Sequence, residues 1–217
     1  MNKNQIIFLT LAVVVLFGGL YGVYKLLGAG PDEALIASIK TERPKERTLW
    51  NGEGAHTLTV FSDFQCPTCK VFHEYLTSFE ATSSPTFPVT KKVAFVFRYF
   101  PLYQIHEHAF SLAYAAEAAA RQGKFEDIAK RFFADQVELE SIKDLDSYLL
   151  IVAKDLKLDT NKFIADMKDG SLQGLIQNDL SIGEKLGINS TPTFYLDGEK
   201  LDSMTAQNLS QLLQKLN

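Results

Sequence analysis

Hydrophobic and polar residues change their spacing along the chain, and each change marks a different kind of element. Residues 6–24 contain no charged side chain, whereas residues 30–51 lack regular apolar spacing. A helix-compatible stretch covers residues 70–76, and a short continuous apolar run covers residues 93–97. From about residue 106 to 186, apolar residues recur at a helical period. The pattern predicts an apolar N-terminal helix, a linker and a soluble α/β domain that contains a long helical block.

The first apolar segment is predicted to be a membrane anchor. Residues 6–24 are long enough to cross the roughly 30 Å hydrocarbon core of a bilayer as a helix. A buried core helix is disfavoured because the segment has no polar face. The alternative is a cleaved signal peptide, but its best cleavage site, the Gly-Ala-Gly at residues 28–30, is poorly placed. We therefore expect a cytoplasmic N-terminus and anchor within residues 1–29, followed by a juxtamembrane linker at residues 30–51.

The orientation of this anchor is not set by its flanking charges. Lys3 precedes the span and Lys25 follows it, so the positive-inside bias is slight. The two cysteines of the chain form a single Cys-x-x-Cys pair, which suits an extracytoplasmic domain. We therefore expect a single-pass protein of the cell membrane whose soluble domain lies on the periplasmic or outer side.

The soluble domain is predicted to cover residues 52–217, which is enough chain for one domain. Residues 193–196, an Asp197-Gly198 turn and the apolar position Leu201 predict a β-hairpin. An amphipathic helix is expected at residues 208–216. The predicted order is β-α-β, a helical insertion at about residues 106–186, and then β-β-α.

Composition excludes several classes of function. A formal net charge of −4 over 217 residues gives no basic footprint for nucleic acid. His106 and His108 are two residues apart and cannot share a helical face, and a zinc site needs about four ligands. Phe125, Phe132 and Phe133 recur at helical spacing and are interpreted as core residues rather than as a ligand box. We therefore expect neither a metal site nor a cofactor.

The candidate chemistry lies in the segment Cys66-Pro67-Thr68-Cys69, between a β-prone run and the helix-compatible stretch. Pro67 suits the first turn of a helix, which would place Cys66 at the helix N-terminus. Unpaired N–H groups and the helix dipole favour a thiolate there, and the thiolate is the form that attacks disulfides. Cys69 is close enough in sequence to close a disulfide with Cys66.

Other interpretations of this cysteine pair are weaker. A structural disulfide normally joins distant segments, and so short a loop constrains the unfolded chain little. Half of a zinc site would need a second cysteine pair, which the chain lacks. The spacing therefore favours redox catalysis over a chance pair, with Cys66 as the nucleophile and Cys69 as the resolving thiol. Pro67 and Thr68 would tune the pair through local geometry.

The segment Phe61-Ser62-Asp63-Phe64-Gln65-Cys66-Pro67-Thr68-Cys69 resembles the active site of the DsbA-like thiol-disulfide oxidoreductases of the thioredoxin superfamily. Later segments fit the same family in order: Phe97-Arg98-Tyr99-Phe100-Pro101-Leu102, His106-Glu107-His108-Ala109, and Gly187-Ile188-Asn189-Ser190-Thr191-Pro192-Thr193-Phe194. The resemblance covers about residues 52–217. It implies a thioredoxin fold with a helical insertion.

The resemblance also implies roles for Thr191 and Pro192. Pro192 would be a cis proline beside the active disulfide, and Thr191 would present its backbone N–H and C=O to an extended substrate. Without the cysteine pair, a Thr-Pro would be interpreted as an ordinary turn. The sequence departs from the pattern at Val60, where thioredoxins and well-known periplasmic oxidases carry a buried acid. Proton transfer during exchange would then need water or another side chain.

The resemblance implies a thiol-disulfide oxidoreductase, and the predicted anchor would tether it to the membrane. Protein dithiol oxidation is favoured over reduction or isomerisation, because isomerases of this superfamily usually add a dimerisation domain. The expected partners are extracytoplasmic proteins that contain cysteines, together with a membrane redox partner that reoxidises the pair. The alternative is a non-catalytic thioredoxin-fold binding module or metal carrier.

Overall fold

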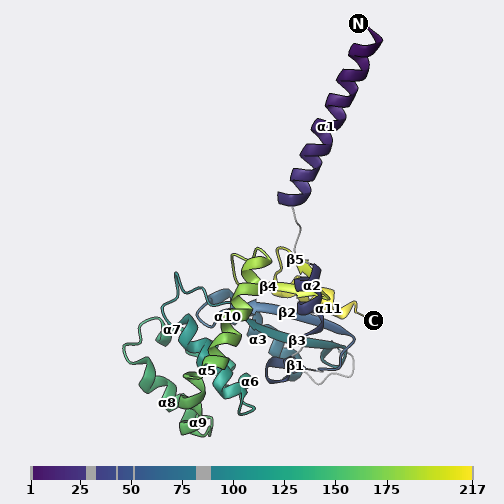
Figure 1. The fold of residues 1–217 in the computed structure, drawn as a ribbon. Helices are drawn as coiled ribbons and strands as arrows, with labels where there is room; N and C mark the ends of the chain where they lie inside the picture. Colours follow the sequence, from purple (N-terminus) through teal and green to yellow (C-terminus); the bar gives the residue numbers. More distant parts are fainter. Residues whose placement is uncertain (1, 28–32, 43, 51, 82–88, 217) are drawn as a thin grey trace. The chain divides into compact units, whose positions relative to one another are not determined.

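A computed structural model describes residues 2–27, 33–42, 44–50, 52–81 and 89–216 (Figure 1). The chain divides into two compact units, residues 1–33 and 34–217.

The first unit contains the helix α1 (Lys3–Leu27), which carries no acidic residue. Its described apolar side chains, such as Val15 and Phe17, are exposed. The described side chains leave out residues 6–9 and 24–32, and within what is described no helix is both long and apolar enough to span a bilayer. The predicted anchor thus falls in part outside the described residues.

The second unit is built on a mixed β-sheet. Its described strands are β1 (Thr48–Trp50), β2 (His56–Ser62), β3 (Val93–Tyr99), β4 (Thr193–Leu196) and β5 (Glu199–Leu201), in the order β1-β3-β2-β4-β5. β2 runs parallel to β3, and the other neighbouring pairs are antiparallel. β2 and β3 are buried almost throughout, as expected of central strands with near-continuous apolar sequence. The sheet and its order give the thioredoxin-like α/β fold.

Alternate side chains of β2 and β4 belong to different layers of the core, because successive residues of a strand point to opposite faces. Val60 and Phe194 belong to one hydrophobic cluster, in which the ring of Phe194 lies 4.8 Å from that of Phe72 on α3 (Pro67–Ala81). Phe61 and Tyr195 belong to a second cluster, with rings 6.0 Å apart. The first cluster includes residues of α11 (Ala206–Gln214), and the second includes residues of α2 (Glu33–Thr41) and α10 (Gly170–Lys185). Helices therefore cover both faces of the sheet.

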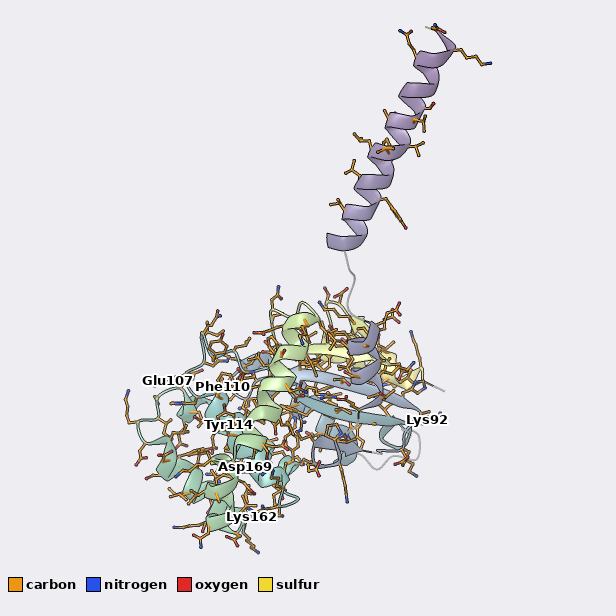
Figure 2. All side chains as sticks on the ribbon, viewed as in Figure 1. Lys92, Glu107, Phe110, Tyr114, Lys162 and Asp169 are labelled. Atoms are coloured by element: carbon orange, nitrogen blue, oxygen red, sulfur yellow. The ribbon has the colours of Figure 1, made fainter. Side chains whose placement is uncertain are left out.

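A helical block connects β3 to β4, where the sequence predicts an insertion. Its helices before α10 are α5 (Ala109–Ala120), α6 (Phe125–Ala134), α7 (Gln136–Leu139), α8 (Leu145–Asp155) and α9 (Thr160–Met167). Phe125, Phe132 and Phe133 are buried in the main core, so their interpretation as core residues is confirmed. Figure 2 shows Phe110 and Tyr114 together on α5, where their rings lie 5.9 Å apart. The short helix α4 (Val89–Lys92) precedes β3.

The segment predicted to be a linker, residues 30–51, contains folded structure over residues 33–42 and 44–50. It carries α2, the 3-10 helix η1 (Lys45–Arg47) and the edge strand β1, which pairs with β3. Ile39 is 1% exposed, and its carbonyl oxygen accepts a hydrogen bond of 2.9 Å from the Thr59 hydroxyl. The linker prediction is therefore wrong for these two stretches.

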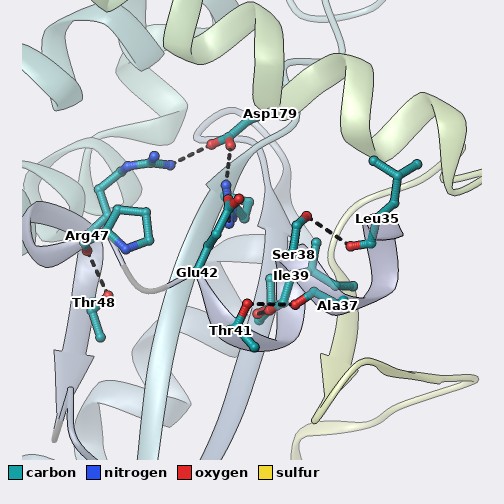
Figure 3. A network of polar contacts seen from close by, with 12 residues as sticks. Leu35, Ala37, Ser38, Ile39, Thr41, Glu42, Arg47, Thr48 and Asp179 are labelled. Carbon is teal, nitrogen blue, oxygen red and sulfur yellow. Dashed lines mark hydrogen bonds and ion pairs between the residues drawn. The ribbon is translucent and has the colours of Figure 1, made fainter. Parts of the chain in front are cut away.

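A buried network of charges fixes this N-terminal segment to the domain (Figure 3). Arg47 binds Asp179 at 2.5 Å and Glu117 at 3.1 Å, and all three side chains are almost fully buried. Arg98 binds the other oxygen of Asp179 at 2.9 Å and also reaches Glu42. Breaking one member of such a network leaves an uncompensated buried charge, which costs about 3–5 kcal/mol. The segment is thus joined to the core by the charged side chain of Arg47. Apolar periodicity in the sequence cannot detect such a contact.

Candidate active site

Both cysteines lie where the central strand β2 passes into the helix α3. β2 ends at Ser62, and α3 begins at Pro67, so Cys66 immediately precedes the helix as the sequence predicts. Both thiols are free, with Cys66 7% exposed and Cys69 2% exposed. The structure therefore holds the pair in its dithiol form.

The surroundings of Cys66 favour its thiolate. The pKa of the Cys66 thiol is lowered to about 6, mainly because the Cys69 thiol donates a hydrogen bond to it. Thr191 and the backbone N–H groups of Cys69 and Thr68 add to this effect, while burial opposes it. At pH 7 a thiol with this pKa is about nine-tenths ionised.

Cys69 is held in the opposite protonation state. Burial raises its pKa well above the ordinary value, and the neighbouring Cys66 raises it further. The Ser62 hydroxyl and the backbone N–H of Asp63 offset this only in part. The two sulfurs therefore differ as a nucleophile and a resolving thiol should. Ser62 was missed by the sequence reasoning, because it sits in an apolar strand without a motif of its own.

Thr191 and Pro192 lie against this pair. The peptide bond between them is cis. The Cys66 thiol lies 3.3 Å from the carbonyl oxygen of Thr191, to which it can donate. The Thr191 hydroxyl is buried and has no hydrogen-bond partner among the described residues. Thr191 nevertheless contributes to the lowered pKa of Cys66.

A groove of about 290 Å³ opens beside the cysteine pair. It lies between the start of α3, the segment that contains the cis proline, and β5 with the residues that follow it. Its lining residues include Thr68, Phe72, Thr191, Pro192, Leu201 and Met204. An extended chain placed here would pass Thr191 within reach of Cys66, which is the arrangement expected of a β-augmentation contact.

Buried polar contacts hold the loop between β2 and α3 in place. Asp63 accepts hydrogen bonds from the backbone N–H groups of Gln65 (2.7 Å) and Leu102 (2.6 Å), and its carboxylate lies 3.0 Å from Nδ1 of His106. The Gln65 side chain accepts a hydrogen bond of 2.7 Å from the backbone N–H of His108. Asp63, His106 and His108 therefore shape the loop, and the resemblance detected them only as a pattern.

His73 does not supply positive charge to the site at neutral pH. Its ring is 4% exposed and lies 4.7 Å from the ring of Phe133. Burial lowers the pKa of His73 to about 4, so the imidazole is neutral near pH 7. Across the described residues, no cluster of three or more His, Cys, Asp or Glu side chains is placed to hold a metal ion.

A family model described as Thioredoxin matches residues 42–215. The chain belongs to this thioredoxin family. A thioredoxin-like oxidoreductase from Silicibacter pomeroyi DSS-3 superposes with a TM-score of 0.65 at 25% identity, covering 81% of this chain and 93% of its own. The thiol-disulfide exchange protein alpha-DsbA2 from Wolbachia pipientis has the same fold, with a TM-score of 0.66 at 16% identity and coverage of 85% and 97%. The chain thus belongs to the thioredoxin family and shares its fold with a DsbA-like exchange protein.

Relatives that are known by sequence include a much longer protein. The Na(+)/H(+) antiporter NhaA 3 of Salinispora tropica is 30% identical over 180 residues, which cover 81% of this chain and 25% of the antiporter. The chain therefore spans about a quarter of the length of this relative.

Proposed function

We propose that this protein is a thiol-disulfide exchange enzyme that oxidises protein dithiols through Cys66 and Cys69. The observation that carries the proposal is the opposite shift of two neighbouring thiols. The pKa of Cys66 is lowered to about 6, and that of Cys69 is raised by burial. This pairing suits a sulfur that exchanges with substrates and a second sulfur that resolves the intermediate.

In the oxidising direction, a client thiolate attacks Sγ of Cys66 in the Cys66–Cys69 disulfide. The S–S bond breaks, and its electron pair goes to Cys69, which takes up a proton because its pKa is high. The second client thiolate then attacks the client sulfur of the mixed disulfide, and Cys66 leaves as a thiolate. The client has lost two electrons and the cysteine pair has gained them. A low pKa makes Cys66 a good leaving group, which favours this direction.

The proposed substrates are extended, cysteine-containing segments of extracytoplasmic proteins. The groove beside Thr68, Thr191 and Pro192 supports an extended ligand. A membrane redox partner would accept the two electrons and return the pair to its disulfide form. Cation exchange is not part of the proposal, because the chain matches only 25% of the antiporter.

A stoichiometric oxidation assay tests the proposal. The oxidised protein is mixed with a reduced, unfolded client, and free thiols are counted by alkylation and mass. We expect one client disulfide per Cys66–Cys69 disulfide consumed, and no oxidation by Cys66→Ser or Cys69→Ser. A binding module or metal carrier would leave client thiols unchanged. Client reduction without client oxidation would favour the reductase direction.

The proposal also places the protein in the cell membrane with its catalytic domain outside. The uncharged stretch at residues 6–24 and the solitary cysteine pair support this topology. We expect the intact mass of membrane-extracted protein to include residues 1–29. After the pair has been reduced, a membrane-impermeant thiol reagent should label Cys66 in intact cells. A mature N-terminus near residue 31, or labelling only after lysis, would contradict the topology.

A further inference from the structure

A glutamine from the helical block contacts the backbone on both sides of the active-site loop. Gln136 is the first residue of α7, and its side chain is 6% exposed. Its Nε2 donates hydrogen bonds to the carbonyl oxygens of Phe64 (2.7 Å) and Cys66 (3.0 Å). Both N–H groups of one amide are thus engaged by the loop that carries the nucleophile.

These two carbonyl groups belong to the backbone that sets the direction of the Cys66 side chain. The carbonyl of Cys66 also accepts the backbone N–H of Lys70 at 3.2 Å, and the N–H of Cys66 donates to the carbonyl of Asp63 at 3.2 Å. With Gln136 in place, the peptide groups before and after Cys66 are held from several sides. The direction of the Cys66 sulfur toward the N–H groups of α3 depends on that backbone orientation.

We propose that Gln136 is a positioning residue for Cys66, through which the helical block aligns the sulfur with the N–H groups of Thr68 and Cys69 and with Thr191. The inference rests on the proposed role of Cys66 as the exchanging thiol. It adds a residue outside the Cys-x-x-Cys and cis-proline segments, and it gives the helical block a direct part in the chemistry. The adjacent Asp135 is bound by Arg131 and by the hydroxyl of Tyr148.

The competing explanation is that Gln136 only satisfies two buried carbonyl groups. Both explanations expect that loss of the amide destabilises the fold. Only the positioning role expects a change in the ionisation of Cys66. The test therefore uses Gln136→Met, which keeps the length of the side chain without its donors, and Gln136→Glu, which replaces the donors by a carboxylate.

The matched control is Gln122→Met. Gln122 also lies in the helical block and also makes two hydrogen bonds to the backbone, both with Asp159, at 3.2 and 2.8 Å. Within the described part of the chain it makes no hydrogen bond to the active-site loop, so its loss should weaken the block without moving Cys66. Folding of each variant is checked by circular dichroism and by denaturant unfolding.

The readout is the rate of Cys66 alkylation by iodoacetamide as a function of pH in the reduced full-length protein. For Gln136→Met we expect the midpoint of the profile to move up by about one unit, which lowers the rate at about pH 5 roughly tenfold and leaves it unchanged at about pH 9. Gln136→Glu should move the midpoint at least as far, because its carboxylate repels both the carbonyl groups and the thiolate. Gln122→Met should keep the wild-type profile.

An unchanged midpoint in folded Gln136 variants would overturn the proposal, as would an equal shift in Gln122→Met. If Gln136→Met does not fold, Gln136→Glu decides the question by the same criterion. Gln136→His, which keeps one N–H donor, should recover part of the shift. Failure of the proposed function would look different, because the wild-type protein would then leave client thiols unoxidised in the stoichiometric assay, whatever its alkylation profile.

Discussion

Replacing Thr191 by valine should weaken the Cys66 thiolate while leaving the shape of the site intact. The Thr191 hydroxyl is buried, has no hydrogen-bond partner among the described residues and contributes to the lowered pKa of Cys66. Valine has nearly the same shape but no hydroxyl. The backbone carbonyl of Thr191, 3.3 Å from the Cys66 sulfur, stays in place. The substitution therefore isolates what this hydroxyl contributes to hydrogen bonding of the Cys66 thiolate.

The size of the effect follows from the strength of such bonds. A hydrogen bond to a charged group is worth about 1.5–3 kcal/mol, and one pKa unit corresponds to about 1.36 kcal/mol. Since Cys69 is the largest contributor, we take the lower limit and expect the Cys66 pKa to rise from about 6 to about 7. The thiolate fraction at pH 7 should then fall from about nine-tenths to about one-half. The reduced form loses about 1 kcal/mol, which makes the midpoint potential about 20 mV more negative.

The assay is a pH titration of the ultraviolet thiolate absorbance in the reduced protein, supported by alkylation rates. Cys69 does not interfere, because its pKa lies well above that of Cys66. Thr193→Val is the matched control: its hydroxyl donates to the carbonyl of Ser190 at 2.8 Å, two residues from Thr191. A Thr191→Val pKa equal to or below that of the wild type, or an equal shift in Thr193→Val, would refute the reasoning.

Three further predictions follow from the same structure. Because a lowered Cys66 pKa stabilises the reduced form, the midpoint potential in glutathione buffers should lie about 20 mV above the roughly −270 mV of thioredoxin; an equal or more negative value would favour the reductase direction. Because His73 is buried and neutral in the folded state, the unfolded state takes up the proton first as the pH falls. The free energy of unfolding should therefore fall by about 3 kcal/mol between about pH 6.5 and the native pKa of His73, about 4. Urea unfolding of His73→Leu should therefore show a flatter loss of stability over that range, and an unchanged slope would contradict it. Arg47→Met should lower the free energy of unfolding by about 3–5 kcal/mol, since Asp179 and Glu117 lose their partner; a loss below about 1 kcal/mol would show that the network does not hold the N-terminal segment.

The central strands and the cysteine pair could be predicted because their signals are local. β3 is a continuous apolar run, and the helical block repeats apolar residues at the period of its helices. Cys66 and Cys69 form a motif whose meaning depends only on the start of the helix that follows.

The missed features depend on contacts between residues far apart in sequence. In the sequence Arg47 has the character of a linker residue. Only the fold brings it into contact with Asp179, which lies far away along the chain. Gln136 is a polar residue at a helix start, and only the fold brings it to Cys66. The one feature of the sequence that could have indicated Gln136 is that a polar side chain directly follows a helix with a strongly apolar face. His73, which follows Cys69 by about one helical turn, does not assist the thiolate, because burial keeps its ring neutral near pH 7.

Trapping of the mixed disulfide tests the central claim most directly. Cys69→Ser and Cys66→Ser are each incubated with a disulfide-linked client peptide at about pH 8, where a larger share of Cys66 is ionised than at neutral pH. The intact mass of each protein is then measured. The account predicts a lasting peptide adduct on Cys66 in Cys69→Ser, a transient adduct in the wild type, and none in Cys66→Ser. Equal adducts in both variants, or an adduct only in Cys66→Ser, would contradict the assignment of Cys66 as the nucleophile and Cys69 as the resolving thiol.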